Sequence, residues 1–402
     1  MNQDIHIGIV GAGRMGSAIY ELLVSSSLYV VGMSETVKVS IADQKPSPSL
    51  HNNYVQLKVT KPTYDGDNTQ FKEFVNDKTL IINALPYTEN INLFKTCFNA
   101  NVPYFDLSED NGLDNYIKRG MPSVPFTMPH CGLAPGMSTV IANHLISDFK
   151  IVKDVNIRVG ALSQNATNKL RYHTSWSGDG LVNEYFGDCQ VVQNGKLSVV
   201  PALSGYEKIT IDGHEYEEFH TSGGIGTFAK TLSDIHPSVK VDGLNVNYKT
   251  LRRIGHHDYV DFLVNDLGLP QHELTKIFKN HIPTTRKDVV ILYVNVRGSS
   301  DETITGGVGI DIDTKGTNYT TTPDETHYYD TQYSERTYLK VFKPETINGR
   351  YMTAIEYTTA IGMLAMVELY LKEKLPQKGY VKQESVKLTD ALYTNFGNYY
   401  RE

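Results

Sequence analysis

The amino-acid sequence predicts an α/β protein with an N-terminal doubly wound parallel sheet, an inserted α+β region, and C-terminal helices that complete the first region. Over roughly the first 145 residues, short apolar runs alternate with apolar residues at helical spacing, which is typical of a parallel sheet. From Val152 onward, apolar and polar residues alternate with period two, which favours strands with one solvated face. Helical spacing returns between Met352 and Leu371. We therefore expect regions that span 1–143, 144–350 and 351–402.

The first region opens with an apolar strand at 5–10, followed by a glycine-rich turn and a helix. Apolar residues at helical spacing, Met15, Ile19, Leu22 and Leu23, indicate this helix. A second strand at 37–42 ends at Asp43. Further strands are predicted at 79–85, 102–107 and 124–128, and a further helix at 90–99.

The second region contains segments that predict longer strands, at 155–159, 209–211 and 289–296. The polar stretch 298–334 predicts an extended hairpin or loop. The apolar stretch 361–371 covers only about half a membrane span and is bounded by charged residues. It therefore predicts a core helix, and we expect no contact with a membrane.

Composition excludes several classes of protein. The 402 residues are 40% hydrophobic, which is enough for two domains with large cores. The net charge of -7, without clustered Lys or Arg, argues against a nucleic-acid partner. Cys97, Cys131 and Cys189 are widely separated, which predicts neither a disulfide nor a metal site. The N-terminal residues lack a secretory pattern, so we expect a soluble, cytoplasmic protein.

The turn after the first strand has the pattern G-x-G-x-x-G, formed by Gly11, Gly13 and Gly16, with Arg14 and Met15 inside it. In a Rossmann domain the first glycine permits the tight turn, the second lets the backbone approach a pyrophosphate, and the third lets helix and strand pack closely. The helix N-terminus offers free N–H groups to the phosphates. The sequence therefore predicts a nicotinamide dinucleotide at this turn.

Asp43, at the end of the second strand, is expected to bind the adenosine ribose. It follows Gly16 by 27 positions, more than the usual spacing of about 20, and the polar segment 25–36 can absorb the excess. A carboxylate here would repel a 2′-phosphate, which favours NAD over NADP. Lys45, two residues later, weakens that preference.

Eight short segments, in this order along the chain, resemble the saccharopine dehydrogenase-like family and, within it, the lysine 6-dehydrogenase branch. They are Asn83–Tyr87, Tyr104–Ser108, Cys131–Gly136, Ser175–Ser177, Gly180–Tyr185, Thr221–Gly224, Lys249–Arg252 and Gly255–His256. The resemblance implies a Rossmann domain completed by C-terminal helices, and an α+β domain that binds substrate and forms a homodimer. It also implies oxidation of a C–N bond by hydride transfer to a nicotinamide. In this branch, L-lysine becomes its 6-semialdehyde with loss of ammonia.

Two segments depart from the family pattern. Ala134 stands where saccharopine-forming members carry an acidic residue, which favours the lysine branch. Residues 252–256 read Arg-Arg-Ile-Gly-His where the branch has Arg-Tyr-Pro-Gly-His. The local geometry of this second segment is therefore expected to differ.

Such a reaction needs a base for the amine proton and a cation for the substrate carboxylate. Arg171 and His173 occupy alternate positions before Trp176, so we expect them on one face of a strand. Arg252 and His256 are four residues apart, so we expect them on one face of a helix. In each pair the arginine would bind the carboxylate and the histidine would accept the proton. The alternatives are a surface ion pair for Arg171, a structural histidine for His173, and a solvated helix face for Arg252 and His256.

Asp106 ends a predicted strand at the edge where open α/β sheets bind ligands. It would bind the substrate ammonium or order a loop, and helix capping by Asp106 or Ser108 is the alternative. Tyr87 and Trp176 are expected to line the substrate, and Leu85 and Pro86 the nicotinamide.

Two other functions remain open at this point. A saccharopine or carboxynorspermidine type dehydrogenase would need a second cationic centre in the cleft for its larger substrate. A non-catalytic nucleotide-binding protein would keep the glycine turn alone. Glu184 is expected to pair with an arginine, and Cys131 to pack as a small side chain.

Overall fold

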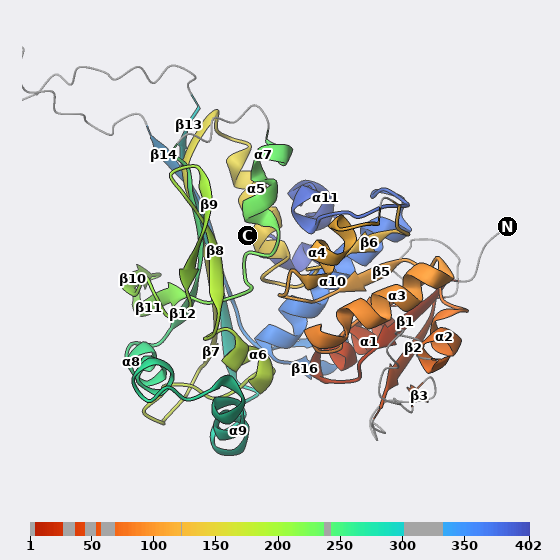
Figure 1. Ribbon diagram of the computed structural model, residues 1–402, viewed down its shortest axis with the longest axis horizontal. Helices are drawn as coiled ribbons and strands as arrows, with labels where there is room; N and C mark the ends of the chain where they lie inside the picture. The colour runs from red at the N-terminus through yellow and green to blue at the C-terminus, as the bar shows by residue number, and fades with distance from the viewer. Residues whose placement is uncertain are drawn as a thin grey trace, which may run out of the picture.

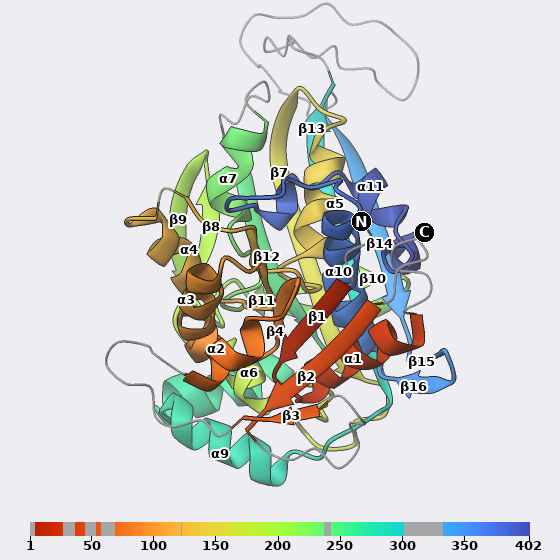
Figure 2. The ribbon, with the colours of Figure 1, turned by 90° about the vertical axis from the view of Figure 1, so that its right-hand side faces the viewer.

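The computed structural model describes residues 5–26, 37–44, 54–57, 69–121, 123–236, 243–300 and 333–402. It contains two large sheets with helices between and around them. In Figure 1 the parallel sheet lies on the right and the second sheet on the left, with α5 (Met137–Ile146) and α10 (Ala354–Leu371) between them. Figure 2 views the molecule from the side of the parallel sheet.

The first sheet has six parallel strands in the order β3-β2-β1-β4-β5-β6. Its central strand β1 is buried at all six positions, as expected for a strand covered on both faces. The order reverses between β1 and β4, and ligands bind in such sheets at this switch point. The predicted doubly wound sheet is confirmed. The strands are β1 (Ile5–Val10), β2 (Val37–Asp43), β3 (Tyr54–Gln56), β4 (Leu80–Asn83), β5 (Tyr104–Asp106) and β6 (Thr127–Met128).

Helices pack on both faces of this sheet. They are α1 (Arg14–Ser26), α2 (Thr69–Val75), α3 (Asn90–Ala100), α4 (Gly112–Lys118) and α10, and α11 (Leu388–Leu392) packs in turn against α10 and α5. Short helical turns occur at Tyr87–Glu89, Gln383–Ser385 and Gly397–Tyr400.

Helix α10 follows the second sheet in the chain and packs against α1 of the first region. In the described part of the chain it is the one helix long and apolar enough to cross a membrane by length and composition, and 83% of it is buried inside the protein. Its first turn carries a capping box, in which Thr353 and Glu356 bond each other's backbone N–H groups. The predicted core helix is confirmed.

The second sheet is mixed and has eight strands. Its main order is β10-β11-β12-β7-β13-β14, with β8 pairing to β12 and β9. Strands β7 and β12 are parallel, and the other pairs are antiparallel. The three predicted strands lie within β7, β10 and β13. The strands are β7 (Ile151–Ser163), β8 (Asp188–Gln193), β9 (Lys196–Pro201), β10 (Glu207–Ile211), β11 (His214–His220), β12 (Asn245–Arg252), β13 (Asp288–Ser299) and β14 (Ser334–Phe342).

The remaining elements surround this sheet. They are α6 (Gly178–Asn183), α7 (Phe228–Ile235), α8 (His256–Asp261) with the π-helical turn Phe262–Asp266, α9 (Gln271–His281), and the hairpin of β15 (Glu345–Ile347) and β16 (Arg350–Met352). The polar stretch predicted at 298–334 lies mostly outside the described residues; the strands on either side of it, β13 and β14, pair antiparallel.

One continuous core joins the two sheets. It contains Ile7 of β1, Ile361 of α10, Val155 of β7 and Val294 of β13, each fully buried. Asp288, at the start of β13, accepts hydrogen bonds from the backbone N–H groups of Ala354 and Ile355, at 2.7 and 3.0 Å. A residue of the second sheet therefore caps the N-terminus of α10, the helix that packs on the first region.

Candidate functional site

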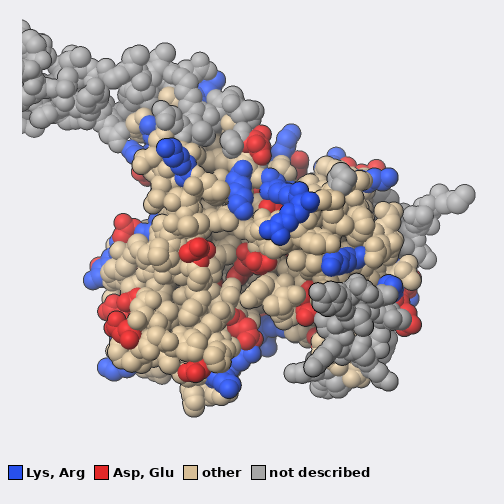
Figure 3. Space-filling view, viewed as in Figure 1, with Lys and Arg blue, Asp and Glu red and all other residues tan. Residues whose placement is uncertain are grey.

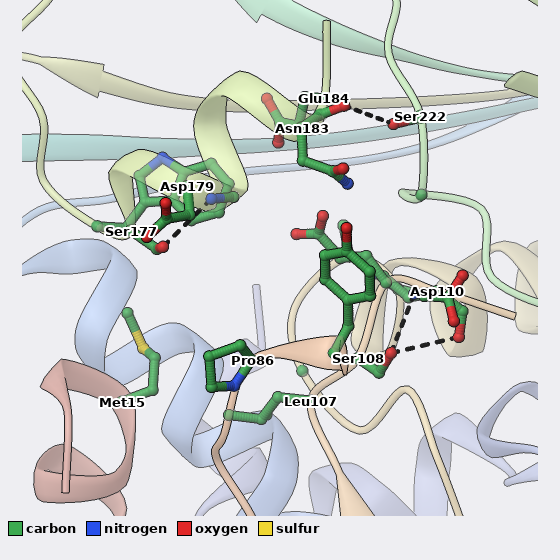
Figure 4. A pocket seen from close by; sticks show the side chains of 18 of the residues that line it. Met15, Pro86, Leu107, Ser108, Asp110, Ser177, Asp179, Asn183, Glu184 and Ser222 are labelled. Carbon is green, nitrogen blue, oxygen red and sulfur yellow. Dashed lines mark hydrogen bonds between the residues drawn. The ribbon is translucent and has the colours of Figure 1, made fainter. Parts of the chain in front are cut away.

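A cavity of about 1560 Å³ lies between the carboxyl ends of the parallel strands and the inner face of the second sheet. Figure 3 shows the molecule hollowed between its two halves, with acidic side chains beside the hollow. In Figure 4, Met15, Pro86 and Leu107 lie on one side of the cavity, and Asp179, Asn183 and Glu184 on the other. The site is thus built from residues far apart in the sequence.

The glycine turn forms the cofactor end of the cavity. Gly11 has φ +105°, and a Cβ there would lie 2.7 Å from the Ala84 carbonyl. A Cβ at Gly16 would lie 1.8 Å from the carbonyl oxygen of Gly11, so this residue serves the packing of α1 and does not line the cavity. A Cβ at Gly13 would meet nothing within 4 Å. Gly13 therefore leaves open space before the N-terminus of α1, which fits a pyrophosphate.

The other residues expected at the cofactor also border this space. Arg14, Met15, Asp43, Leu85 and Pro86 all line the cavity. The Asp43 carboxylate accepts a hydrogen bond from Ala12 N at 2.7 Å, so it also holds the glycine turn. These residues fit a dinucleotide.

Arg14 connects the two halves of the molecule across the cleft. Its guanidinium donates to the backbone carbonyl of Ser175, just before Trp176, and its Nε lies 3.7 Å from Glu356 of α10. The glycine turn is thereby tied to the segment that lines the substrate side.

The loop from β5 to α4 carries several polar side chains, and Asp106 anchors it. One carboxylate oxygen accepts from the N–H groups of Ser108 and His130, at 2.9 and 3.0 Å, and the other accepts from Tyr104 Oη at 3.1 Å. Asp106 is buried, which raises its pKa, and it does not line the cavity. Of the predicted roles, the structure shows the ordering of a loop.

Glu109, in the same loop, lines the cavity, although no motif in the sequence predicted a role for it. Ser108 and Asp110 bond within the loop, since Ser108 Oγ accepts from Asp110 N and Asp110 accepts from Gly112 N. Among the described residues, none donates a hydrogen bond to the Glu109 carboxylate or forms an ion pair with it. Burial and the nearby Glu184 raise its pKa well above the usual value. The sequence does contain one signal for this residue, because Glu109 and Asp110 form an acidic pair shortly after β5, at the carboxyl end of the parallel sheet.

Strand β12 forms the opposite wall. Alternate side chains Tyr248, Thr250 and Arg252 face the cavity, as expected for one face of a strand. Arg252 is 2% exposed, and its Nη2 donates to Glu184 at 2.8 Å. This confirms the expected arginine partner of Glu184. The Nε of Arg252 is buried without a hydrogen-bond partner among the described residues, which leaves one N–H for a ligand.

Two adjacent glycines make room for the side chains that face each other in this cavity. A Cβ at Gly223 would lie 2.7 Å from the Cβ of Glu109. A Cβ at Gly224 would lie 2.2 Å from the ring of Tyr248. The segment 221–224, noted in the sequence for its family resemblance, is thus required by packing.

The prediction that Arg252 and His256 share a helix face is wrong. Arg252 ends β12 and His256 begins α8, because Gly255 at φ +93° turns the chain between them. His256 is fully buried behind the cavity wall, where its Nε2 pairs with Tyr185 Oη and its Nδ1 with the Leu170 carbonyl, both at 2.9 Å. Burial, and then Arg252, lower its pKa to about 3, so the ring is neutral.

The prediction that Arg171 and His173 lie on a strand is also wrong. Strand β7 ends at Ser163, and a turn follows in which Asn168 bonds the backbone of Arg171 and Tyr172. Arg171 is exposed at φ +55°, and neither it nor His173 lines the cavity.

The aromatic residues expected at the substrate do line the cavity. Trp176 donates its indole N–H to Tyr172 Oη at 3.1 Å, and Tyr87 is 45% exposed. Cys131 is buried and donates to the Met128 carbonyl, as expected for a packing residue.

Acidic groups outnumber basic ones on the cavity wall. Its described lining contains two arginines, Arg14 at the glycine turn and Arg252 on β12. Its acidic residues are Asp43, Glu109, Asp110, Asp179, Glu184 and Asp188. The substrate side therefore has one arginine, which already pairs with Glu184. In the described part of the chain, no group of three or more His, Cys, Asp or Glu side chains is placed to hold a metal.

Comparisons with known proteins agree with this architecture. The saccharopine dehydrogenase NADP binding domain matches residues 7–123, and the saccharopine dehydrogenase C-terminal domain matches residues 132–398. The fold is similar to saccharopine dehydrogenase (L-Glu forming) from Saccharomyces cerevisiae, with a TM-score of 0.66 at 14% identity over 98% of both chains. It is also similar to homospermidine synthase from Legionella pneumophila in complex with NAD, with a TM-score of 0.62 at 10% identity over 99% of this chain and 90% of that one. Because the two family domains together cover most of its length, the chain belongs to the saccharopine dehydrogenase family.

Proposed function

We propose that this NAD(P)-dependent oxidoreductase oxidises the C–N bond of a cationic amino acid, and that its substrate is L-lysine, deaminated at the 6-amino group. The observation that carries the proposal is the charge of the cavity beside the glycine turn. Its substrate side holds several carboxylates and a single arginine, Arg252, which Glu184 already neutralises.

This charge distribution favours lysine over saccharopine. At neutral pH lysine carries two ammonium groups and one carboxylate, whereas saccharopine carries three carboxylates. One buried N–H of Arg252 suits a single carboxylate oxygen. A second cationic centre for further carboxylates is missing from the described substrate side of the lining.

The residues around the cavity have separate roles in this proposal. The open space at Gly13 and the N-terminus of α1 would hold the pyrophosphate of the nucleotide, which when bound supplies the hydride acceptor. Arg252 would bind the substrate carboxylate. Trp176 and Tyr87 would cover the aliphatic chain and exclude water from it.

Turnover assays test the proposal directly. The absorbance of reduced nicotinamide would be followed with L-lysine, saccharopine and ornithine, each with NAD and with NADP. We expect lysine to have the highest kcat/KM. Turnover of saccharopine alone would assign the activity named for the yeast relative, and silence with all three despite tight NADH binding would favour a non-catalytic nucleotide-binding protein.

We propose NAD as the preferred cofactor, because the Asp43 carboxylate at the end of β2 would repel a 2′-phosphate. Asp43→Ala should therefore reduce the ratio of NAD to NADP affinity, measured by titration with the reduced nucleotides. It should also lower stability by about 1 kcal/mol, since the hydrogen bond to Ala12 N is lost. An unchanged ratio would place the ribose contact at another residue.

A further inference from the structure

The chemistry of amine oxidation requires a base in the cavity. Hydride leaves a carbon only when the attached nitrogen has a lone pair to form the C=N bond. A lysine ammonium, with a pKa of about 10.4, has none at neutral pH. A group beside the nitrogen must therefore take up a proton before hydride leaves.

Most carboxylates of the cavity are engaged elsewhere. Glu184 pairs with Arg252, and Asp179 pairs with Lys279 at 2.6 Å. Asp110 accepts from the backbone of Gly112, and Asp43 lies at the cofactor end. Asp188, at the start of β8, is exposed to water.

Glu109 differs from these in position and in partners. It follows β5 at the carboxyl end of the parallel sheet and lines the same cavity as the glycine turn, and its side chain packs against Gly223, whose missing Cβ leaves the space. Hydrogen bonds to Asp106, Ser108 and Asp110 order the backbone of this loop, whereas the Glu109 carboxylate has no hydrogen-bond partner among the described residues.

We infer that Glu109 is the catalytic base, which accepts a proton from the 6-ammonium group of the substrate. This assignment rests on the proposed function. In the step, one N–H bond of the ammonium breaks and one O–H bond forms on the Glu109 carboxylate. A bound oxidised nicotinamide would accept the hydrogen of the adjacent carbon as hydride, with both electrons of its C–H bond, and the nitrogen lone pair would form the C=N bond of an iminium. Water later replaces the nitrogen, which leaves as ammonia.

The groups that face Glu109 suit this role. Burial, and then the charge of Glu184 at the end of α6, raise the pKa of Glu109, and Arg252 balances the charge of Glu184. Tyr248 of β12 is buried beside both carboxylates. A carboxyl group with a raised pKa is a stronger base than an exposed one, and the arriving ammonium would favour its charged form.

Three variants test the assignment by turnover. Glu109→Gln should lower kcat/KM for the amino acid by roughly 100- to 10,000-fold and remove the acidic limb of its pH profile. NADH affinity and the circular dichroism spectrum should stay as in the wild type. Glu109→Asp should keep part of the activity together with the acidic limb, and added formate should restore activity to Glu109→Ala.

Glu215→Gln, the same chemical change at an exposed position of β11, serves as the matched control. A kcat/KM within about threefold of wild type, with the same pH profile, would overturn the assignment.

A binding measurement separates this inference from the proposed function. Calorimetry of 1,5-diaminopentane binding to the NADH complex, in two buffers of different ionisation enthalpy, counts the protons exchanged. Below the raised pKa of Glu109, amine binding should expel a proton from the wild type and none from Glu109→Gln. Equal proton counts would remove Glu109 as the group that meets the amine. If the wild type turns over none of the amino acids while its proton count still depends on Glu109, this outcome would reject the proposed substrate and leave the assignment of Glu109 in place.

Discussion

At the scale of single residues, two glycines of the same turn serve opposite purposes. Gly13→Asp would add its side chain to open space in the cavity, since a Cβ there meets nothing within 4 Å. The protein should fold normally, but NADH binding should weaken by roughly 100-fold, or about 2.7 kcal/mol, because bulk and negative charge replace the pyrophosphate. Fluorescence titration with NADH measures the effect. Unchanged NADH affinity in Gly13→Asp would contradict the nucleotide site.

Gly16→Ala provides the contrast. Its Cβ would lie 1.8 Å from the carbonyl oxygen of Gly11, so the turn must move. We expect a lower melting temperature, with a loss of about 1–3 kcal/mol.

His256 makes stability depend on pH in a direction that its burial fixes. Its pKa is lowered from 6.5 to about 3 in the folded protein, so between these values the unfolded chain binds the extra proton. The free energy of unfolding therefore falls as pH decreases below 6.5, by up to about 1.4 kcal/mol per pH unit from this group. Urea unfolding between pH 5 and 7 should show a shallower dependence in His256→Gln than in the wild type. His214→Gln, at an exposed position, should keep the wild-type slope.

At the scale of elements, α10 depends on a residue from the second sheet. The Asp288 carboxylate accepts hydrogen bonds from Ala354 N and Ile355 N, which no earlier turn of the helix can satisfy. Asp288→Ala should lower the free energy of unfolding by about 2 kcal/mol, measured by urea unfolding. Asp266→Ala, at an exposed position, should change it by less than about 0.5 kcal/mol. Equal losses in both variants would mean that the cap contributes nothing.

Elements were predicted well where their pattern is local. Strands β1, β2, β4 and β5 and helix α3 lie within a few residues of their expected bounds, because burial on both faces produces continuous apolar runs. The expected strand through Arg171 failed because Asn168 forms a turn there. The expected helix through Arg252 failed because Gly255 separates a strand from a helix.

At the scale of the whole molecule, the first region does not bury its core alone. Helix α10 follows the second sheet in the chain, yet it shares one core with Ile7 and Val294. A fragment of residues 1–143 should therefore lack a cooperative thermal transition by circular dichroism, whereas the full chain should show one. A fragment that melts cooperatively and binds NADH would show that α10 is dispensable for this domain.

The sequence by itself determined the parallel sheet, the glycine turn, the returning helix and the resemblance to the family, because each depends on residues close together in the chain. Only the tertiary structure decided which polar side chains share the cavity. Asp106 and Glu109 are three residues apart in the chain. The Asp106 carboxylate accepts a hydrogen bond from the backbone N–H of His130, whereas the Glu109 carboxylate lies near Glu184. The Arg252 and Glu184 pair spans 68 positions. Burial and partners at such distances follow from how the two sheets pack, which no local pattern records.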